Sequence, residues 1–327
     1  MWCYHLKKSR PGLAMHGSRK QERDLPMSSN DIATRVTNPG KGHAICHNPR
    51  DRLKQFLIIG VQKAGTTTLF NLLDSIPGFC GSSVKEIGFF TKDVFYQKGE
   101  SWYLEHFQKC GRGAIKFEAS PAYLYYPSAP KRIYSFNRDM KFIVVLREPA
   151  ARCHSAWNMF RRFNESTADQ IFTQFIQHAN PPEREAISKL LFAKHYPSFK
   201  QAVADDIDRY VSKSSDIEPS FVRRGLYWGQ IANYLHYFKL GNFLFLEQGE
   251  LNHPVTALQK VSDFLNVKID LNSINSLPPS NIGDYLSCDA QTEGTILMLR
   301  EFYKPHNEKL FSQIGVHYNW NEAGAER

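Results

Sequence analysis

The sequence predicts an α/β fold in which a central parallel sheet lies between two layers of helices, and three observations support this. Strands are expected at 55–60, 114–118 and 141–147, and the first and third contain the apolar runs typical of buried strands. Helical patterns follow the first and third of these strands, as parallel strand connections require. A length of 327 residues and 42% hydrophobic content allow one large core.

The order of elements follows from the turn residues. The strand at 55–60 leads to a helix at 65–75, which ends before Pro77 and Gly78. A connector follows, then a helical stretch near 102–108 and the strand at 114–118. The later elements are recognised by helical spacing or by strand composition; they are a strand at 141–147, helices at 150–162, 168–179, 183–194, 198–213 and 224–239, a strand at 243–247, and helices at 254–265 and 293–314. Pro305 is expected to kink or break the last helix.

The turn after the first strand predicts an anion-binding site. Residues 56–69 read FLIIGVQKAGTTTL, so the strand breaks at Gly60 and a helix with three threonines in its first turn starts after Gly65. Free backbone N–H groups and the positive helix end favour a phosphate there, which makes the predicted three-layer fold P-loop-like. In nucleotide triphosphatases the lysine follows the second glycine, whereas here Lys63 precedes it.

A second strand-to-helix turn supplies a cation. The strand at 141–147 ends in Arg147, and Pro149 suits the first turn of a helix. A cation at the end of a buried strand needs an anionic partner, either a ligand phosphate or an internal carboxylate such as Glu118. The aspartate of a magnesium-binding strand is replaced by this arginine, so no metal ligand is offered here.

These two turns together resemble the sulfotransferases that use 3′-phosphoadenosine 5′-phosphosulfate (PAPS), and the polysaccharide branch more closely than the small-molecule branch. The likeness extends from about Lys54 to the C-terminus and includes the segments 224–227, 243–247 and 299–310. These segments look like heparan sulfate 3-O-sulfotransferases and N-acetylgalactosamine 4-sulfate 6-O-sulfotransferase. The resemblance implies transfer of the sulfuryl group of PAPS to a hydroxyl acceptor, a glycan or glycosaminoglycan, whose recognition varies within 179–225.

The resemblance also implies how PAPS is bound. The first loop is expected to grip the 5′-phosphosulfate, and Arg147 and Ser155, eight residues apart, the 3′-phosphate. Lys63 suits the leaving phosphate oxygen because its ammonium is a mobile point charge; a solvated surface lysine is the alternative. The residues of the expected phosphosulfate loop are Lys63, Ala64, Gly65, Thr66, Thr67 and Thr68, one of whose threonines is expected to act only as a helix cap.

Glu86 is the predicted general base. In the heparan sulfate branch a glutamate is followed two residues later by histidine and then two aromatics, and residues 86–90 resemble this motif with Gly88 at the histidine position. A carboxylate beside a phosphosulfate takes the acceptor's proton if burial raises its pKa. The alternative is a solvated loop glutamate beside Lys85.

Acceptor binding is expected from the end of the second strand. Glu118 lies at the same sheet edge as the other loops, where it either meets the acceptor or orients Lys63. Tyr123 is expected to stack on a sugar ring or to belong to the core. Ala119 stands where the 3-O-sulfotransferase pattern has a lysine, and residues 279–285 lack the basic fork that closes over the 3′-phosphate in relatives.

Composition separates a tail from the domain. Residues 1–52 are predicted to be a basic, disordered tail and 53–327 the sulfotransferase domain. Residues 1–54 hold 11 Lys or Arg against 4 Asp or Glu, which accounts for most of the net charge of +9. Such a basic tail would attract nucleic acid only through generic charge, so no specific nucleic-acid site is expected. Six cysteines without a C-x-x-C pair predict no metal site; they fit lumenal disulfides or cytosolic thiols equally.

Two questions stay open at this level. The chain contains no run of about 18 apolar residues and no signal-peptide pattern, so no membrane span is expected, whereas the resemblance implies the Golgi lumen; the cytoplasm is the alternative.

Two other functions compete with sulfuryl transfer. One is a P-loop kinase or NTPase, against which the position of Lys63 argues. The other is a catalytically silent protein that binds PAPS or a glycan, which Gly88 and the altered 279–285 segment motivate.

Overall fold

The computed structural model describes residues 55–214, 218–270 and 289–320, and within them five strands form one parallel sheet in the order β2-β3-β1-β4-β5. The strands are β1 (Gln55–Gly60), β2 (Phe79–Gly81), β3 (Ile115–Ala119), β4 (Lys141–Leu146) and β5 (Phe243–Glu247). The predicted central parallel sheet is therefore confirmed. The expected tail at 1–52 and the segment 279–285 lie outside the described residues.

Helices cover both faces of this sheet, which gives the three predicted layers. On one face α2 (Thr66–Asp74) packs its Phe70 ring 5.1 Å from that of Phe117 in β3. On the other face α11 (Tyr227–Leu235) places the ring of Tyr234 5.3 Å from that of Phe142 in β4. Two short helices pack near α11 on this second face, α5 (Ala122–Tyr125) and α6 (Ala129–Phe136).

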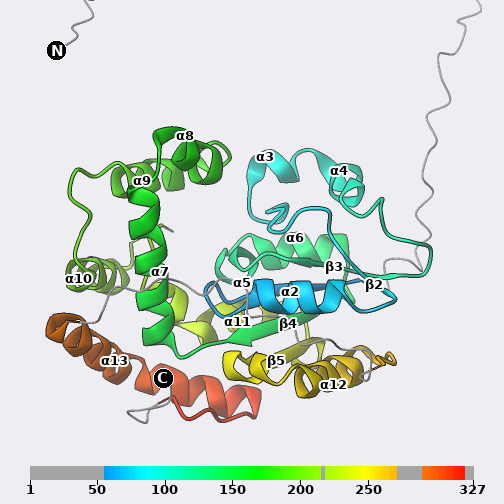
Figure 1. Cartoon of the computed structure of the whole chain (residues 1–327). Coiled ribbons are helices and arrows are strands. Elements are labelled where there is room, and N and C mark those ends of the chain that lie inside the picture. Colours follow the sequence, from blue (N-terminus) through cyan, green and yellow to red (C-terminus); the bar gives the residue numbers. More distant parts are fainter. Residues whose placement is uncertain (1–54, 215–217, 271–288, 321–327) are drawn as a thin grey trace, which may run out of the picture. The chain divides into compact units, whose positions relative to one another are not determined.

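A second group of helices builds its own core beside the sheet (Figure 1). Phe160, Phe199 and Leu299 are buried there, each from a different helix. The members are α7 (Pro149–Asn164), α8 (Ala168–Ile171), α9 (Pro181–Leu191), α10 (Phe199–Val211) and α13 (Ala290–Ile314). Helix α13 continues through Pro305, so of the kink or break expected at this proline, the break is not found.

The remaining elements are short, except for α12 beside β5 (Figure 1). They are α3 (Asp93–Tyr96), α4 (Gly99–Glu105), α12 (Pro254–Leu265), a π-helical turn at Phe172–Ile176 and 3₁₀ turns at Arg223–Gly225, Leu240–Asn242 and Gln248–Asn252. In the described parts of the chain, no helix has the length and apolar character needed to cross a bilayer.

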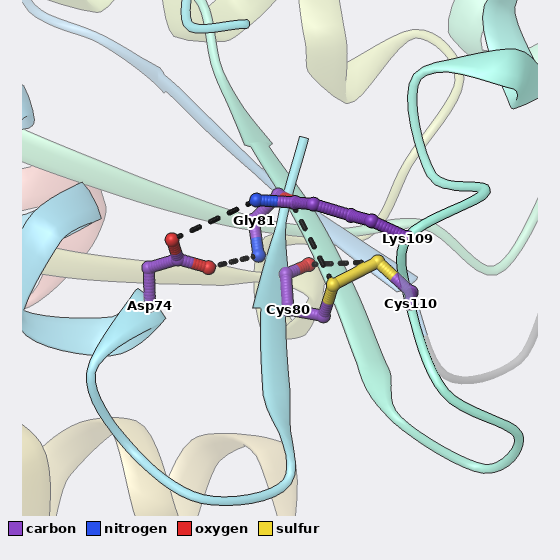
Figure 2. Close-up of a disulfide and its surroundings, with 5 residues drawn as sticks. All are labelled: Asp74, Cys80, Gly81, Lys109 and Cys110. Carbon is purple, nitrogen blue, oxygen red and sulfur yellow. Dashed lines mark hydrogen bonds and ion pairs between the residues drawn. A yellow bond between two sulfur atoms is a disulfide. The ribbon is translucent and has the colours of Figure 1, made fainter. Parts of the chain in front are cut away.

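A disulfide joins the edge strand β2 to the segment before β3. It links Cys80 and Cys110, whose Cα atoms are 5.7 Å apart. Figure 2 shows the disulfide and the contacts of Asp74 on opposite sides of β2. The Asp74 carboxylate accepts a hydrogen bond of 2.6 Å from the backbone N–H of Gly81 and lies 3.9 Å from the ammonium of Lys109. Both ends of the segment 80–110 are thereby attached to the sheet edge.

Candidate active site

The two turns that the sequence singles out lie against each other. The Arg147 guanidinium donates a hydrogen bond of 2.9 Å to the backbone carbonyl of Lys63, 84 residues away in the sequence. This contact follows from the sheet order, because β1 and β4 are neighbours and their carboxyl ends meet at one edge. The Tyr227 hydroxyl donates to the carbonyl of Arg147 at 2.8 Å, which fixes the backbone of the second turn.

The first turn has the features of an anion-binding loop. Gly65 is the N-cap of α2 with a φ of 86°, and a Cβ at this position would stand 2.8 Å from a methyl group of Leu251. Glycine is therefore required here for both its conformation and its size. The first turn of α2 contains no acidic residue, so no carboxylate offsets the positive end of the helix. Thr67 and Thr68 are half-exposed in that turn.

Three other residues of this loop lie at different depths. Lys63 is half-exposed and has a positive φ of 72°, Ala64 is fully buried, and Thr66 is 5% exposed. The loop thus presents Lys63 and the last two threonines at its surface, whereas Ala64 and Thr66 fix it to the core.

The start of α7 is already capped by the protein. The Glu148 carboxylate accepts hydrogen bonds of 2.8 and 2.7 Å from the backbone N–H groups of Ala150 and Ala151. Ser155 lies further along this helix and is nearly fully buried. The structure thus places Ser155 on the helix that follows Arg147. The N-terminal end of α7, unlike that of α2, is thus occupied by a carboxylate of the protein. The acidic residue directly before Pro149 was the sequence signal for this cap.

Glu86 lies at the carboxyl end of β3. Its backbone N–H donates to the carbonyl of Ala119 at 3.0 Å, and its φ is 62°. Because β3 neighbours β1 in the sheet, this contact puts Glu86 at the same edge as the loop between β1 and α2. The burial expected for a general base is not found: its side chain is 60% exposed, and one carboxylate oxygen accepts a hydrogen bond of 2.5 Å from the Lys85 ammonium.

Glu118 and Tyr123, by contrast, belong to the core. Neither has any exposed surface, and the Glu118 carboxylate accepts hydrogen bonds from three hydroxyl groups: Tyr103 at 2.9 Å, Tyr123 at 2.8 Å and Ser120 at 2.5 Å. Burial raises the pKa of Glu118, although these hydrogen bonds and one from the backbone of Ile87 oppose the shift. In this arrangement the two side chains support the loop that carries Glu86, and neither has surface with which to meet an acceptor or Lys63. Nothing in the sequence indicated that Tyr103, 15 residues earlier, would donate a hydrogen bond to Glu118.

A family model for the sulfotransferase domain matches residues 53–280, about 70% of the chain. The chain belongs to the sulfotransferase family. Among the relatives of this sulfotransferase is mouse heparan sulfate glucosamine 3-O-sulfotransferase 5, 27% identical over 306 residues that cover 88% of this chain and 79% of the relative. Human heparan sulfate glucosamine 3-O-sulfotransferase 6 is also 27% identical, over 87% of this chain and 79% of the relative.

A solved structure supports the fold of this sulfotransferase. The crystal structure of a sulfotransferase from Alicyclobacillus acidocaldarius matches with a TM-score of 0.59 at 22% identity, over 82% of this chain and 98% of that one. The predictions of a carbohydrate sulfotransferase family and of a PAPS-dependent sulfotransferase are confirmed by the family match and the relatives. Among the described residues no group of three His, Cys, Asp or Glu side chains is placed to hold a metal ion.

Proposed function

We propose that this sulfotransferase transfers the sulfuryl group of PAPS to a hydroxyl group of a glycan, with Glu86 as general base and Lys63 stabilising the leaving phosphate. The observation that carries this proposal is the contact between Arg147 and the Lys63 carbonyl, because it brings a cation to a loop that offers backbone donors to an anion. The relatives named as heparan sulfate sulfotransferases support a glycan as the acceptor.

The residues present fit the donor. The glycine cap of α2, the threonines of its first turn and the nearby Arg147 together suit a doubly anionic ligand. The proposed contacts are Lys63 to Thr68 with the 5′-phosphosulfate, and Arg147 and Ser155 with the 3′-phosphate. When bound, PAPS supplies the sulfuryl group and leaves as adenosine 3′,5′-bisphosphate.

The proposed roles of Glu86 and Lys63 divide the charge changes of the reaction. Glu86 takes the proton of the acceptor hydroxyl while the acceptor oxygen forms its bond to sulfur. The sulfur–oxygen bond to the phosphate breaks, and Lys63 offsets the negative charge that develops on the departing oxygen. Exposure of Glu86 supports access by a large acceptor.

We further propose an oxidising compartment, such as the lumen of the secretory pathway. Disulfides persist in such compartments and are rare in the cytosol. The Cys80–Cys110 disulfide therefore favours the lumenal alternative over the cytoplasmic one.

Transfer of labelled sulfate from PAPS to a panel of glycosaminoglycans tests the function. We expect Glu86→Gln to lower kcat about 100- to 10,000-fold, the usual contribution of general acid–base catalysis, while calorimetry shows unchanged binding of adenosine 3′,5′-bisphosphate. Glu308→Gln is the matched control, because Glu308 is an exposed glutamate on α13.

The same two measurements separate the competing functions. Binding of adenosine 3′,5′-bisphosphate without transfer to any hydroxyl acceptor would favour a catalytically silent protein. Magnesium-dependent ATP hydrolysis without sulfate transfer would favour a P-loop NTPase. Equal turnover by Glu86→Gln and the wild type would exclude Glu86 as the base and leave the transferase activity itself intact.

A further inference from the structure

Arg300 brings a cation from α13 to the turn that carries Arg147. Helix α13 packs on α7 (Figure 1), and the Arg300 Nε lies 3.9 Å from a carboxylate oxygen of Glu148, the residue that directly follows Arg147. The Arg300 side chain is 24% exposed, so a ligand can reach it although most of its surface is buried. This turn therefore has a second guanidinium group close by, supplied by an element near the other end of the chain.

Two buried neighbours on α13 fix the position of Arg300. Leu299, directly before it, has no exposed surface. Tyr303, one turn later on the same side of the helix, is also fully buried, and its hydroxyl donates a hydrogen bond of 2.6 Å to the carbonyl of Val222. The backbone under Arg300 is thereby held before any ligand arrives, which lowers the entropic cost of binding through this side chain.

Glu148 gives Arg300 an ion pair without a hydrogen bond. Both carboxylate oxygens of Glu148 already accept hydrogen bonds from backbone N–H groups of α7, at 2.8 and 2.7 Å. A separation of 3.9 Å from Arg300 is too long for a hydrogen bond, and the buried Nε of Arg300 has no hydrogen-bond partner within the described parts of the chain. A buried donor without an acceptor is unfavourable, and an incoming anion would supply the acceptor.

The charges around this turn favour a ligand with more than one negative charge. Arg152 has no exposed surface, and two of its three guanidinium nitrogens lack a hydrogen-bond partner among the described residues. Burial raises the pKa of Tyr227, and the charges of Arg152 and Glu148 lie close enough to act on it as well. The Tyr227 hydroxyl also donates to the carbonyl of Arg147. Three guanidinium groups, with that of Arg300, thus stand against one carboxylate.

We propose that Arg300 binds the 3′-phosphate of the donor nucleotide together with Arg147. This inference rests on the proposed function, since it names a further contact of the nucleotide expected at this turn. A phosphate monoester carries a charge of about −1.5 to −2 at pH 7 and has three acceptor oxygens, which suits two guanidinium groups from different elements. Arg300 gives up no hydrogen bond to Glu148 when it turns to the phosphate. Residues 279–285 contain no lysine or arginine, and the helix that follows them supplies this cation.

Two nucleotides that differ only in the 3′-phosphate test this inference. Arg300→Met keeps an apolar stem and removes the charge, whereas Arg300→Lys keeps the charge and loses the planar fork. Lys309→Met removes an exposed charge from the same helix as the matched control. Calorimetry measures binding of adenosine 3′,5′-bisphosphate and, by displacement, of adenosine 5′-monophosphate. Phosphorus NMR of the bound bisphosphate reports on its two phosphates separately, and thermal melts without nucleotide report on stability.

We expect Arg300→Met to weaken binding of adenosine 3′,5′-bisphosphate about 10- to 100-fold, the usual effect of losing a hydrogen bond to a charged group. Binding of adenosine 5′-monophosphate should change less than about twofold, and only the resonance of the 3′-phosphate should move. Arg300→Lys should lose less affinity than Arg300→Met, and Lys309→Met should match the wild type. In transfer from PAPS, the KM for PAPS should rise and kcat should change little, because the contact is equal in the ground and transition states.

Other outcomes would overturn the inference. Equal losses with both nucleotides would show that Arg300 only holds α13 to α7. Undiminished binding of the bisphosphate by Arg300→Met, movement of the 5′-phosphate resonance alone, or no binding of the bisphosphate to the wild type would exclude a contact with the 3′-phosphate. Should Arg300→Met fail to fold, an unchanged 3′-phosphate resonance in Arg300→Lys would exclude it equally. A loss confined to the bisphosphate, in a protein whose wild type transfers no sulfate, would keep this site and reject the proposed catalytic function.

Discussion

The Cys80–Cys110 disulfide should be a major contributor to the stability of the domain. It closes a loop between residues separated by 30 positions, and this loop contains Glu86, α3 and α4. The entropy of an open loop of this length corresponds to about 3.6 kcal/mol at 25 °C. We therefore expect the double variant Cys80→Ser, Cys110→Ser to unfold with a free energy about 3 to 4 kcal/mol lower than that of the oxidised wild type.

Urea denaturation of the wild type and the double variant, each with and without reductant, measures this difference. Reductant should lower the wild type to the stability of the variant and leave the variant unchanged, because its one described cysteine, Cys153, is buried and unpaired. Lys109→Met is the local control, since the exposed Lys109–Asp74 pair at 3.9 Å should contribute less than about 1 kcal/mol. Equal midpoints for the double variant and the oxidised wild type would refute the entropic argument.

Three further predictions concern single positions. Gly225→Ala should destabilise the protein by about 1 to 3 kcal/mol in thermal melts, because the added Cβ would lie 2.6 Å from the Tyr303 hydroxyl oxygen; Gly294→Ala, with no atom within 4 Å, should not. Glu118→Ala should cost more than about 2 kcal/mol in urea unfolding, since three buried hydroxyls lose their acceptor, whereas stability within error of the wild type would contradict its structural role. Arg147→Met should weaken calorimetric binding of adenosine 3′,5′-bisphosphate about 10- to 100-fold, and unchanged binding would exclude Arg147 from the nucleotide site.

The sequence predicted the elements whose signals are long and local. The apolar runs of β1 and β4 and the glycine and proline residues that follow them specify strands, turns and helix starts by short-range sterics. Strand β2 was missed because it has only three residues after the Pro77–Gly78 turn. The helix does not break at Pro305, one of the two outcomes expected there. Tyr303 and Asn307, on either side of the proline, are buried, and the packing of α13 outweighs the loss of one backbone hydrogen bond.

The sequence predicted where in the fold the candidate site lies, but not how deeply its side chains are buried. Alternating strands and helices require the loops after β1, β3 and β4 to share one edge, so the proximity of Lys63 and Arg147 follows from topology. Sequence spacing carries no information on how far a side chain at that edge is buried. Glu118 and Glu86 illustrate this: the first has no exposed surface and three hydroxyl partners, and the second is 60% exposed.

The difference between these two carboxylates explains how the proposed base can be exposed and still be well placed. The Glu86 backbone donates to Ala119 in β3, while the neighbouring Ile87 donates to the buried Glu118, so both residues of this turn are attached to the sheet. The segment that contains them is closed by the Cys80–Cys110 disulfide. A rigid backbone under an exposed carboxylate gives a large acceptor access to the base without loss of positioning. Because Glu118 supports the loop that carries the proposed base, we expect a conservative Glu118→Gln substitution to lower kcat more than it raises KM.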